Sequence, residues 1–263
     1  MEELLVSDIC LSEVKITFSL SDTEILKNLY IYTQGLVYNI LNAGDRVVTT
    51  LIHDDKKPKN FIFKPMVVKG KVGELTIKFT SSRLLGIFLQ GLSNRANTLK
   101  FGNLLLLLTK YEIKQENPYT FYDCPKFVPI EFETPTLYRL KETDDYIRFP
   151  GVYEFVTSLY SKLAVDYIFL VSKIGFEKMI SMIHIDRVVY GKTVFTSIFR
   201  KDRYDDNISG FVGKILYYID ADVAVRNIIY KLFKIGEFYG NGSRTSCGFG
   251  NYSIKLRGEK ENV

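Results

Sequence analysis

The stretch Gly240-Asn-Gly-Ser-Arg-Thr-Ser-Cys-Gly-Phe-Gly250 places four glycines and one arginine between a helical pattern and a strand pattern. Apolar residues recur with helical spacing over residues 225–233, and residues 252–256 alternate between apolar and polar. Glycines reach positive φ and let consecutive backbone N–H groups turn toward an anion, and Arg244 adds a positive charge. This order of helix, loop and strand predicts a phosphate-binding loop, with a tight turn carrying a β-bulge as the alternative.

The loop does not have the context of a nucleotide-binding fingerprint. Both Gly-x-Gly-x-x-Gly and the Walker loop follow a strand and open a helix, whereas this loop follows a helix and precedes a strand. A small-molecule enzyme that holds nucleotide phosphates at the N-terminus of a helix is therefore disfavoured.

The composition indicates a globular chain with packed cores. Its 263 residues are 46% hydrophobic and 14% aromatic, enough for one large or two small domains. The formal net charge is +5 and the pI is near 8.8, which permits a polyanionic partner without requiring one.

The cysteines and histidines are too few and too scattered to suggest a metal site. Cys10, Cys124 and Cys247 are widely spaced, and only His53 and His184 accompany them, so no set of zinc-ligand spacings can be assembled. We expect no metal and no cofactor. The first residues lack the basic region of a signal peptide, and the longest apolar run, residues 104–108, is too short to span a bilayer. We therefore expect a cytoplasmic protein with reduced thiols and no membrane partner.

The chain reads as two similar halves, each with the order strand, helix, strand, strand, helix, strand. In the first half, Ser21-Asp-Thr-Glu24 forms a capping box before a helix that runs to about residue 41. The remaining elements of that half follow from hydrophobic periodicity: strands at residues 14–20, 61–68, 75–79 and 104–113, a polar stretch at residues 45–59, and a helix at residues 82–96.

Two X-Pro steps, Asn117-Pro118 and Cys124-Pro125, mark a linker between the halves. The second half then repeats the cycle, with strands near residues 127–140, 188–199, 211–219 and 252–256, and helices that start at Pro150 and near Ala221. Residues 167–187 fit no element of the cycle and are interpreted as an insertion. The sequence thus predicts an α+β protein of two tandem ferredoxin-like (RRM-like) βαββαβ domains, residues 1–120 and 121–263.

The terminal loop, with Gly-x-Gly, five further residues and Gly-Phe-Gly, resembles the glycine-rich motif of the repeat-associated RNA-binding superfamily of CRISPR systems. In that superfamily the loop joins the last helix to the last strand of a ferredoxin-like domain and faces RNA. The tandem arrangement resembles the CRISPR-associated endoribonucleases that process repeat RNA. Five further segments look like landmarks of that family: residues 33–39, 58–61, 132–139, 149–151 and 210–213.

Tyr38, His53 and Lys59 match the catalytic tyrosine, histidine and lysine of archaeal members of that family in type, order and spacing. The residues themselves point the same way. Tyr38 lies roughly opposite the apolar stripe of its helix, where it is free for chemistry or, alternatively, for contact with the second domain. His53 lies in a segment too polar for a core, and an imidazole with a pKa of about 6.5 can exchange protons near neutral pH.

Without a metal, RNA is most simply cut by its own 2′-OH, which requires a base, an acid and a cation. His53 and Tyr38 would exchange the protons, and Lys59 would stabilise the extra negative charge of the transition state. The products would be a 2′,3′-cyclic phosphate and a 5′-hydroxyl. Asp54 and Asp55 could raise the pKa of His53, and the sequence leaves open which residue is base and which acid.

The predicted RNA contacts come from two loops. They are Arg46, Lys56, Lys57, Arg244 and the glycines Gly240, Gly242, Gly248 and Gly250. Each basic residue is alternatively a solvated surface charge, whereas several weak phosphate contacts together bind appreciably. His184 stands in an apolar run, so we expect a packed histidine and keep it as the fallback catalytic candidate.

These observations favour an endoribonuclease that processes CRISPR repeat RNA (pre-crRNA). The alternative is a non-catalytic RNA-binding subunit of a CRISPR interference complex, because the fold and the loop permit both. The expected partner is repeat RNA in either case, and an interference complex is a further partner that the resemblance allows. The sequence leaves open whether the protein is a monomer or a homodimer.

Overall fold

The structure, a computed structural model, describes residues 9–22, 29–54, 59–95, 99–117, 124–140, 145–164, 166–167, 172–200 and 203–256. The chain divides into two compact units. Unit 1 consists of Met1–Asn117, Thr196–Ile208 and Ser246–Gly248, and unit 2 of Pro118–Phe195, Ser209–Thr245 and Phe249–Val263. Short pieces of the second half of the sequence therefore belong to unit 1.

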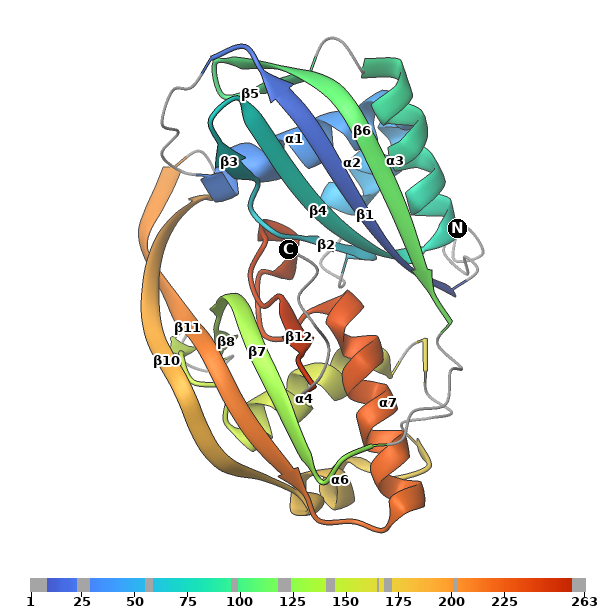
Figure 1. Cartoon of the computed structure of the whole chain (residues 1–263), viewed down its shortest axis with the longest axis vertical. Coiled ribbons are helices and arrows are strands. Elements are labelled where there is room, and N and C mark those ends of the chain that lie inside the picture. Colours follow the sequence, from blue (N-terminus) through green and yellow to red (C-terminus); the bar gives the residue numbers. More distant parts are fainter. Residues whose placement is uncertain are drawn as a thin grey trace. The chain divides into compact units, whose positions relative to one another are not determined.

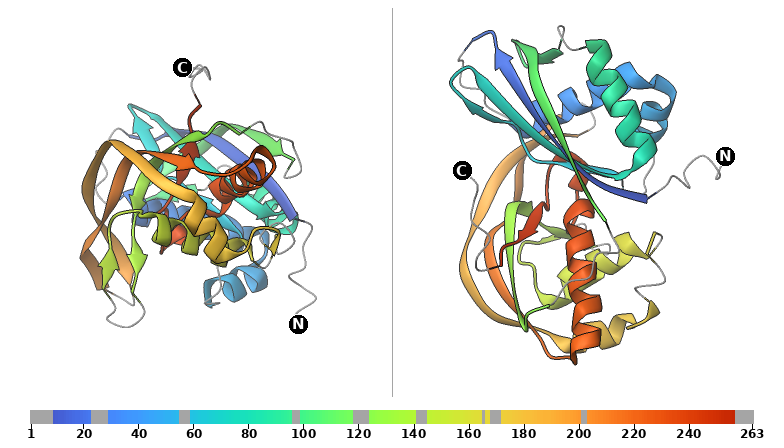
Figure 2. Two further views of the ribbon diagram at one scale, coloured as in Figure 1. Left: turned by 90° about the horizontal axis from the view of Figure 1, so that it is seen from below. Right: turned by 45° about the vertical axis from the view of Figure 1, so that its right-hand side comes forward.

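Unit 1 is an antiparallel sheet with helices packed on one face, as Figures 1 and 2 show from two directions. Its elements are β1 (Ile9–Leu20), α1 (Leu29–Gly44), α2 (Arg46–Asp54), β2 (Phe61–Phe63), β3 (Val67–Lys69), β4 (Val72–Ser81), α3 (Ser82–Arg95), β5 (Leu99–Phe101) and β6 (Leu104–Glu116). The strand order is β2-β4-β1-β6-β5, and β3 pairs with β4. Apart from α2 and the short hairpin strand β5, this is the predicted βαββαβ order.

Two details of unit 1 differ from the prediction. The single strand expected at residues 61–68 is divided into β2 and β3, with Pro65 between them, where proline has no N–H to offer a ladder. The helix α1 continues to Gly44, three residues past the predicted end. Of the predicted capping box, Ser21 is described, and its Oγ accepts from the N–H of Leu105 at 3.1 Å; Glu24 lies outside the described residues.

The helices α1 and α3 approach each other closely because glycines stand at their contact. A Cβ at Gly91 would lie 1.8 Å from the carbonyl oxygen of Ile40, and one at Gly44 would lie 2.0 Å from that of Ile87. Beneath them, the fully buried rings of Phe61, Phe79 and Phe88 form a continuous aromatic contact in the core. The helix layer of unit 1 is thereby fixed on its sheet.

Unit 2 repeats the same architecture (Figure 1). Its elements are β7 (Phe127–Thr136), β8 (Tyr138–Arg139), β9 (Tyr146–Ile147), α4 (Val152–Leu163), α6 (Phe176–Met182), β10 (Ile183–Arg200), β11 (Arg203–Ile219), α7 (Val223–Tyr239), a 3₁₀ turn at Thr245–Cys247 that is shared with unit 1, and β12 (Tyr252–Ile254). The order β10-β11-β7-β12 confirms the predicted ferredoxin-like arrangement, in which the first and third strands are central. The ambiguous stretch at residues 167–187 contains the short helix α6 and the start of β10.

The core of unit 2 is built around Phe155. Its ring contacts the rings of Phe132, Tyr217 and Phe233 at centroid distances of 5.1–6.0 Å. The Tyr217 hydroxyl donates to the carbonyl of Pro150 at 2.7 Å, so this buried tyrosine leaves no free donor.

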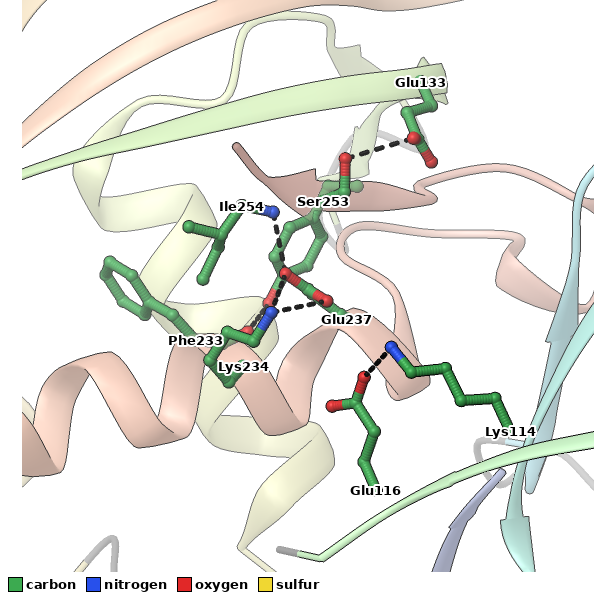
Figure 3. A network of polar contacts seen from close by, with 9 residues as sticks. Lys114, Glu116, Glu133, Phe233, Lys234, Glu237, Ser253 and Ile254 are labelled. Atoms are coloured by element: carbon green, nitrogen blue, oxygen red, sulfur yellow. Dashed lines mark hydrogen bonds and ion pairs between the residues drawn. The ribbon is translucent and has the colours of Figure 1, made fainter. Parts of the chain in front are cut away.

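A buried carboxylate fixes the last strand against α7. Glu237 accepts hydrogen bonds from the N–H of Ile254 at 2.7 Å and from the ammonium of Lys234 at 3.2 Å (Figure 3). On the same helix, the carbonyl of Phe233 accepts from the hydroxyl of Tyr252 at 2.7 Å. β12 is therefore held by the side of α7 as well as by its pairing with β7.

The expectation that His184 is a packed histidine is wrong. His184 is exposed at the start of β10, where its ring stacks on Tyr218 with a centroid distance of 6.3 Å. Alternation along the strand carries it to the outer face, although the neighbouring residues are apolar.

Candidate active site

The polar stretch at residues 45–59, for which the sequence predicted neither a helix nor a strand, begins with the helix α2. Asp45 caps it, since its Oδ1 accepts from the N–H of Val48 at 3.0 Å. Val48 and Ile52, four residues apart, are half-buried against the core of unit 1. An aspartate followed by apolar residues at helical spacing was the available signal.

Tyr38 projects from α1 next to the entrance of β2. It is half-buried, and its ring meets the ring of Phe61 edge-on at a centroid distance of 5.8 Å. Burial, and secondarily the nearby Cys247, raise the pKa of the Tyr38 phenol to about 12. The phenol is therefore neutral at physiological pH.

Lys59 and His53 are brought to the same end of α2. The ammonium of Lys59 donates to the carbonyl of Ile52, which immediately precedes His53. The backbone of His53 lies in the last turn of α2, one helical turn after Thr49, while its imidazole lies outside the described part of the chain. Asp54 shares that last turn, and Asp55 lies outside the described residues.

An open pocket of about 540 Å³ lies beside Tyr38 in unit 1. Its lining comes from three helices: Gly35, Tyr38, Asn39 and Asn42 from α1, Thr49 and Thr50 from α2, and Arg95 from α3. The described residues of this lining offer amides, hydroxyls and a guanidinium, and none of them carries a carboxylate.

Part of the glycine-rich loop, Ser246–Gly248, belongs to this same unit. The side-chain amide of Gln34 on α1 donates to the sulfur of Cys247 at 3.5 Å. At Gly248, with φ +89°, a Cβ would lie 2.8 Å from the Phe63 ring and 3.3 Å from that of Tyr30. Close packing against these rings requires glycine at this position.

The loop residues of unit 2 have their backbone donors engaged within the chain. The N–H groups of residues 240–243 donate, in order, to Gly236 O, Gly250 O, Ser158 Oγ and Leu137 O at 2.7–2.9 Å. The N–H of Gly250 donates to the carbonyl of Pro135 at 3.0 Å. These groups do not form the phosphate cradle expected from the sequence, because each already has an acceptor.

Two basic residues support the loop in unit 2. Arg244 donates from Nη2 to the hydroxyl of Tyr146 at 2.7 Å, and its guanidinium carbon lies 5.6 Å from the centre of that ring. The half-buried Lys162 of α4 donates to the carbonyls of Gly240 at 3.2 Å and Gly242 at 2.9 Å, and burial lowers its pKa to about 7. Lys162 was not among the predicted site residues, since a helix face gives no sign of a distant loop.

Of the other basic residues predicted to bind phosphate, the structure describes Arg46 but not Lys56 and Lys57. Arg46 is exposed at the first residue of α2, on the unit that carries Tyr38 and Lys59. Arg95, which the sequence reading missed, reaches the pocket from the last turn of α3, where a basic residue is ordinarily explained by the helix dipole.

Over the described ranges, no helix is both long and apolar enough to cross a membrane. Within the same part of the chain, no three His, Cys, Asp or Glu side chains gather as a metal site requires.

Comparison with known proteins identifies relatives of this architecture. Residues 130–252 match the family model of the CRISPR-associated endoribonuclease Cas6. No protein with a curated description matches the sequence significantly.

The solved structures that resemble this chain include several Cas6 proteins. A Cas6 product complex superposes with a TM-score of 0.78 at 15% identity, covering 94% of this chain and 100% of that one. The Thermus thermophilus Cas6 gives 0.71 at 14% identity, with 95% and 100% covered. A Cas6-related protein of Pyrococcus furiosus gives 0.62 at 16% identity, with 94% and 99% covered. Matches at these identities establish a shared fold.

Proposed function

We propose that this chain, whose residues 130–252 match the family model of the CRISPR-associated endoribonuclease Cas6, cuts CRISPR repeat RNA by attack of the substrate's own 2′-OH. Two observations support the proposal: Tyr38 lines one pocket together with Thr49 and Thr50 of α2, and the ammonium of Lys59 donates to the carbonyl of Ile52, which precedes His53 in the last turn of α2. A phenol, an imidazole and an ammonium are the groups that such a transesterification needs.

The reaction moves one proton off the nucleophile and one onto the leaving group. The 2′-oxygen forms a bond to the adjacent phosphorus while the bond from phosphorus to the 5′-oxygen breaks. The products are a 2′,3′-cyclic phosphate and a 5′-hydroxyl, and no water is consumed. His53 transfers protons at this centre, because an imidazole can both accept and donate near pH 7.

Tyr38 acts as a neutral hydrogen-bond donor. Its raised pKa disfavours a resting phenolate, so it does not begin the cycle as the base. Lys59, whose ammonium donates to the Ile52 carbonyl, stabilises the phosphorane-like transition state. A fixed ammonium stabilises developing charge there more strongly than a solvated one.

The other assignments belong to the same proposal. Unit 1 carries the catalytic residues, and repeat RNA is the partner. Arg46, Lys56, Lys57 and the outer residues of the glycine-rich loop contact the phosphate backbone. The N–H groups of residues 240–243 already donate to acceptors within the chain. We therefore assign the RNA contacts of the loop to Arg244 and the residues that follow it.

The test is single-turnover cleavage of 5′-labelled CRISPR repeat RNA from the source genome, with EDTA present. We expect cleavage to continue in EDTA and to stop when a single 2′-deoxynucleotide replaces the one that carries the nucleophile. His53→Ala should slow cleavage roughly 10²- to 10⁴-fold with little change in RNA affinity. The matched control is His184→Ala, which removes the other histidine, exposed on β10.

Cleavage of the deoxy-substituted RNA at the parent rate would refute the 2′-OH mechanism, and loss of cleavage in EDTA would indicate metal-activated water. Binding without cleavage by the parent protein would instead indicate a non-catalytic RNA-binding subunit.

A further inference from the structure

The pocket beside Tyr38 has a chemistry that the proposed triad does not use. Arg95 contributes a guanidinium, whose planar set of donors matches phosphate oxygens, and Asn39 and Asn42 contribute exposed amides that both donate and accept. The Thr50 hydroxyl donates to the Arg46 carbonyl at 2.9 Å, which leaves its lone pairs to accept. Such a lining suits a ligand that is anionic at one end and a mixed donor and acceptor elsewhere.

We propose that this pocket is a subsite for one nucleotide of the bound RNA, next to the scissile phosphate, with Arg95 binding that nucleotide's phosphate. The proposal rests on the proposed function, since Tyr38 lines the same pocket. The pocket is open, and its volume of about 540 Å³ falls within the range of about 300–1,000 Å³ typical of sites for small ligands.

The absence of a side chain at Gly35 keeps the pocket open. Glycine is unfavourable in a helix interior, so its presence there needs a reason. At Gly44 and Gly91 the reason is the close packing of α1 on α3. At Gly35 no atom of the described residues, apart from the chain neighbours and the backbone of the same helix, lies within 4 Å of an added Cβ, so these residues leave room for a side chain. Any larger residue there enters the pocket rather than the core.

This geometry allows the pocket to be filled without disturbing the fold. Gly35→Leu places a side chain in the pocket beside Tyr38. Gly86→Leu is the matched control, because Gly86 is also exposed within a helix, has no atom within 4 Å of an added Cβ, and does not line the pocket. Both variants should unfold at denaturant concentrations no lower than the parent, since glycine is replaced by a good helix former.

The first measurement is the affinity of each variant for CRISPR repeat RNA that carries the non-cleavable 2′-deoxynucleotide, together with single-turnover cleavage of the all-ribose RNA. We expect Gly35→Leu to weaken binding or slow cleavage at least roughly tenfold, while Gly86→Leu matches the parent. Equal behaviour of the two leucine variants would overturn the subsite.

The second measurement locates the phosphate that Arg95 binds. Each phosphate near the cut is replaced in turn by an uncharged methylphosphonate, and affinities are compared for the parent and Arg95→Ala. At one position the replacement should weaken the parent roughly tenfold and leave Arg95→Ala unaffected, the signature of a lost pairwise contact. Arg95→Ala should also lower the slope of log affinity against log salt by about 0.7, the contribution of one phosphate on a single strand.

The outcomes separate this inference from the proposed function. If the parent cleaves RNA and each methylphosphonate weakens RNA binding by Arg95→Ala as much as it weakens binding by the parent, the subsite proposal is wrong and the proposed nuclease function is unaffected. If the parent binds RNA without cutting it, the affinity measurements still decide the subsite and the proposed reaction fails. Protection of the parent against unfolding by ATP, with no RNA binding, would indicate a small-molecule nucleotide site and overturn both.

Discussion

Gly248→Ala tests the placement of the glycine-rich loop in unit 1. The new Cβ would lie 2.8 Å from the ring of Phe63, which is fully buried, and 3.3 Å from that of Tyr30. Overpacking of this kind destabilises by about 1–3 kcal/mol. The positive φ of +89° adds roughly 1–2 kcal/mol for a residue that carries a Cβ. We therefore expect a total loss of about 2–5 kcal/mol.

Gly175→Ala separates the two contributions. Gly175 has a similar φ of +79°, but an added Cβ there meets no atom within 4 Å, so only the backbone strain remains. Urea denaturation followed by circular dichroism gives the free energy of unfolding of each variant. Gly248→Ala should lose at least 1 kcal/mol more than Gly175→Ala, as the overpacking range implies. Equal losses would refute the contact between the loop and the aromatic rings of unit 1.

Three other changes probe the buried polar groups. Glu237→Ala leaves the Ile254 N–H and the Lys234 ammonium without their acceptor, so the free energy of unfolding should fall by about 3 kcal/mol in urea denaturation, and a loss below 1 kcal/mol would contradict this. The pKa of Lys162 is about 7 in the folded protein and ordinarily 10.5, so between these pH values the unfolded state binds more protons than the folded state. The free energy of unfolding of the parent should therefore rise relative to that of Lys162→Met as the pH increases from 7 toward 10.5. A difference that stays constant across this window would show that Lys162 is not desolvated. Tyr38→Phe removes the proposed hydrogen bond to the negatively charged transition state and should slow single-turnover cleavage roughly 10- to 100-fold, with the pH dependence of the rate unchanged. If one of the pKa values that govern the rate disappears in this variant, Tyr38 is the base.

The sequence by itself determined the succession of elements in both units. Alternation at residues 75–79 and helical spacing at residues 82–96 each arise from one face of one element being buried, and that signal is local. The same reasoning missed α2, because residues 45–59 were interpreted only as a polar stretch, although Val48 and Ile52 have helical spacing. It also misplaced His184, since an apolar run does not reveal which face of a strand is covered.

The candidate site was visible only in part. Tyr38, His53 and Lys59 were chosen by residue type and spacing, and the glycines were read as a cradle for an anion. Sequence cannot show whether a backbone N–H is already engaged, and residues 240–243 donate to acceptors that are distant in the chain, such as Leu137 O. The glycines are explained at least partly by packing.

Only the tertiary structure brought Arg95 beside Tyr38 and Cys247 beside Gln34, a pair 213 residues apart. The strand order β2-β4-β1-β6-β5 and the close approach of α1 to α3 at Gly44 and Gly91 decide which helix ends meet around the pocket. Periodicity reports whether a residue faces a core, because burial repeats along one element. It carries no information about which other element lies opposite, because that depends on contacts between distant parts of the chain.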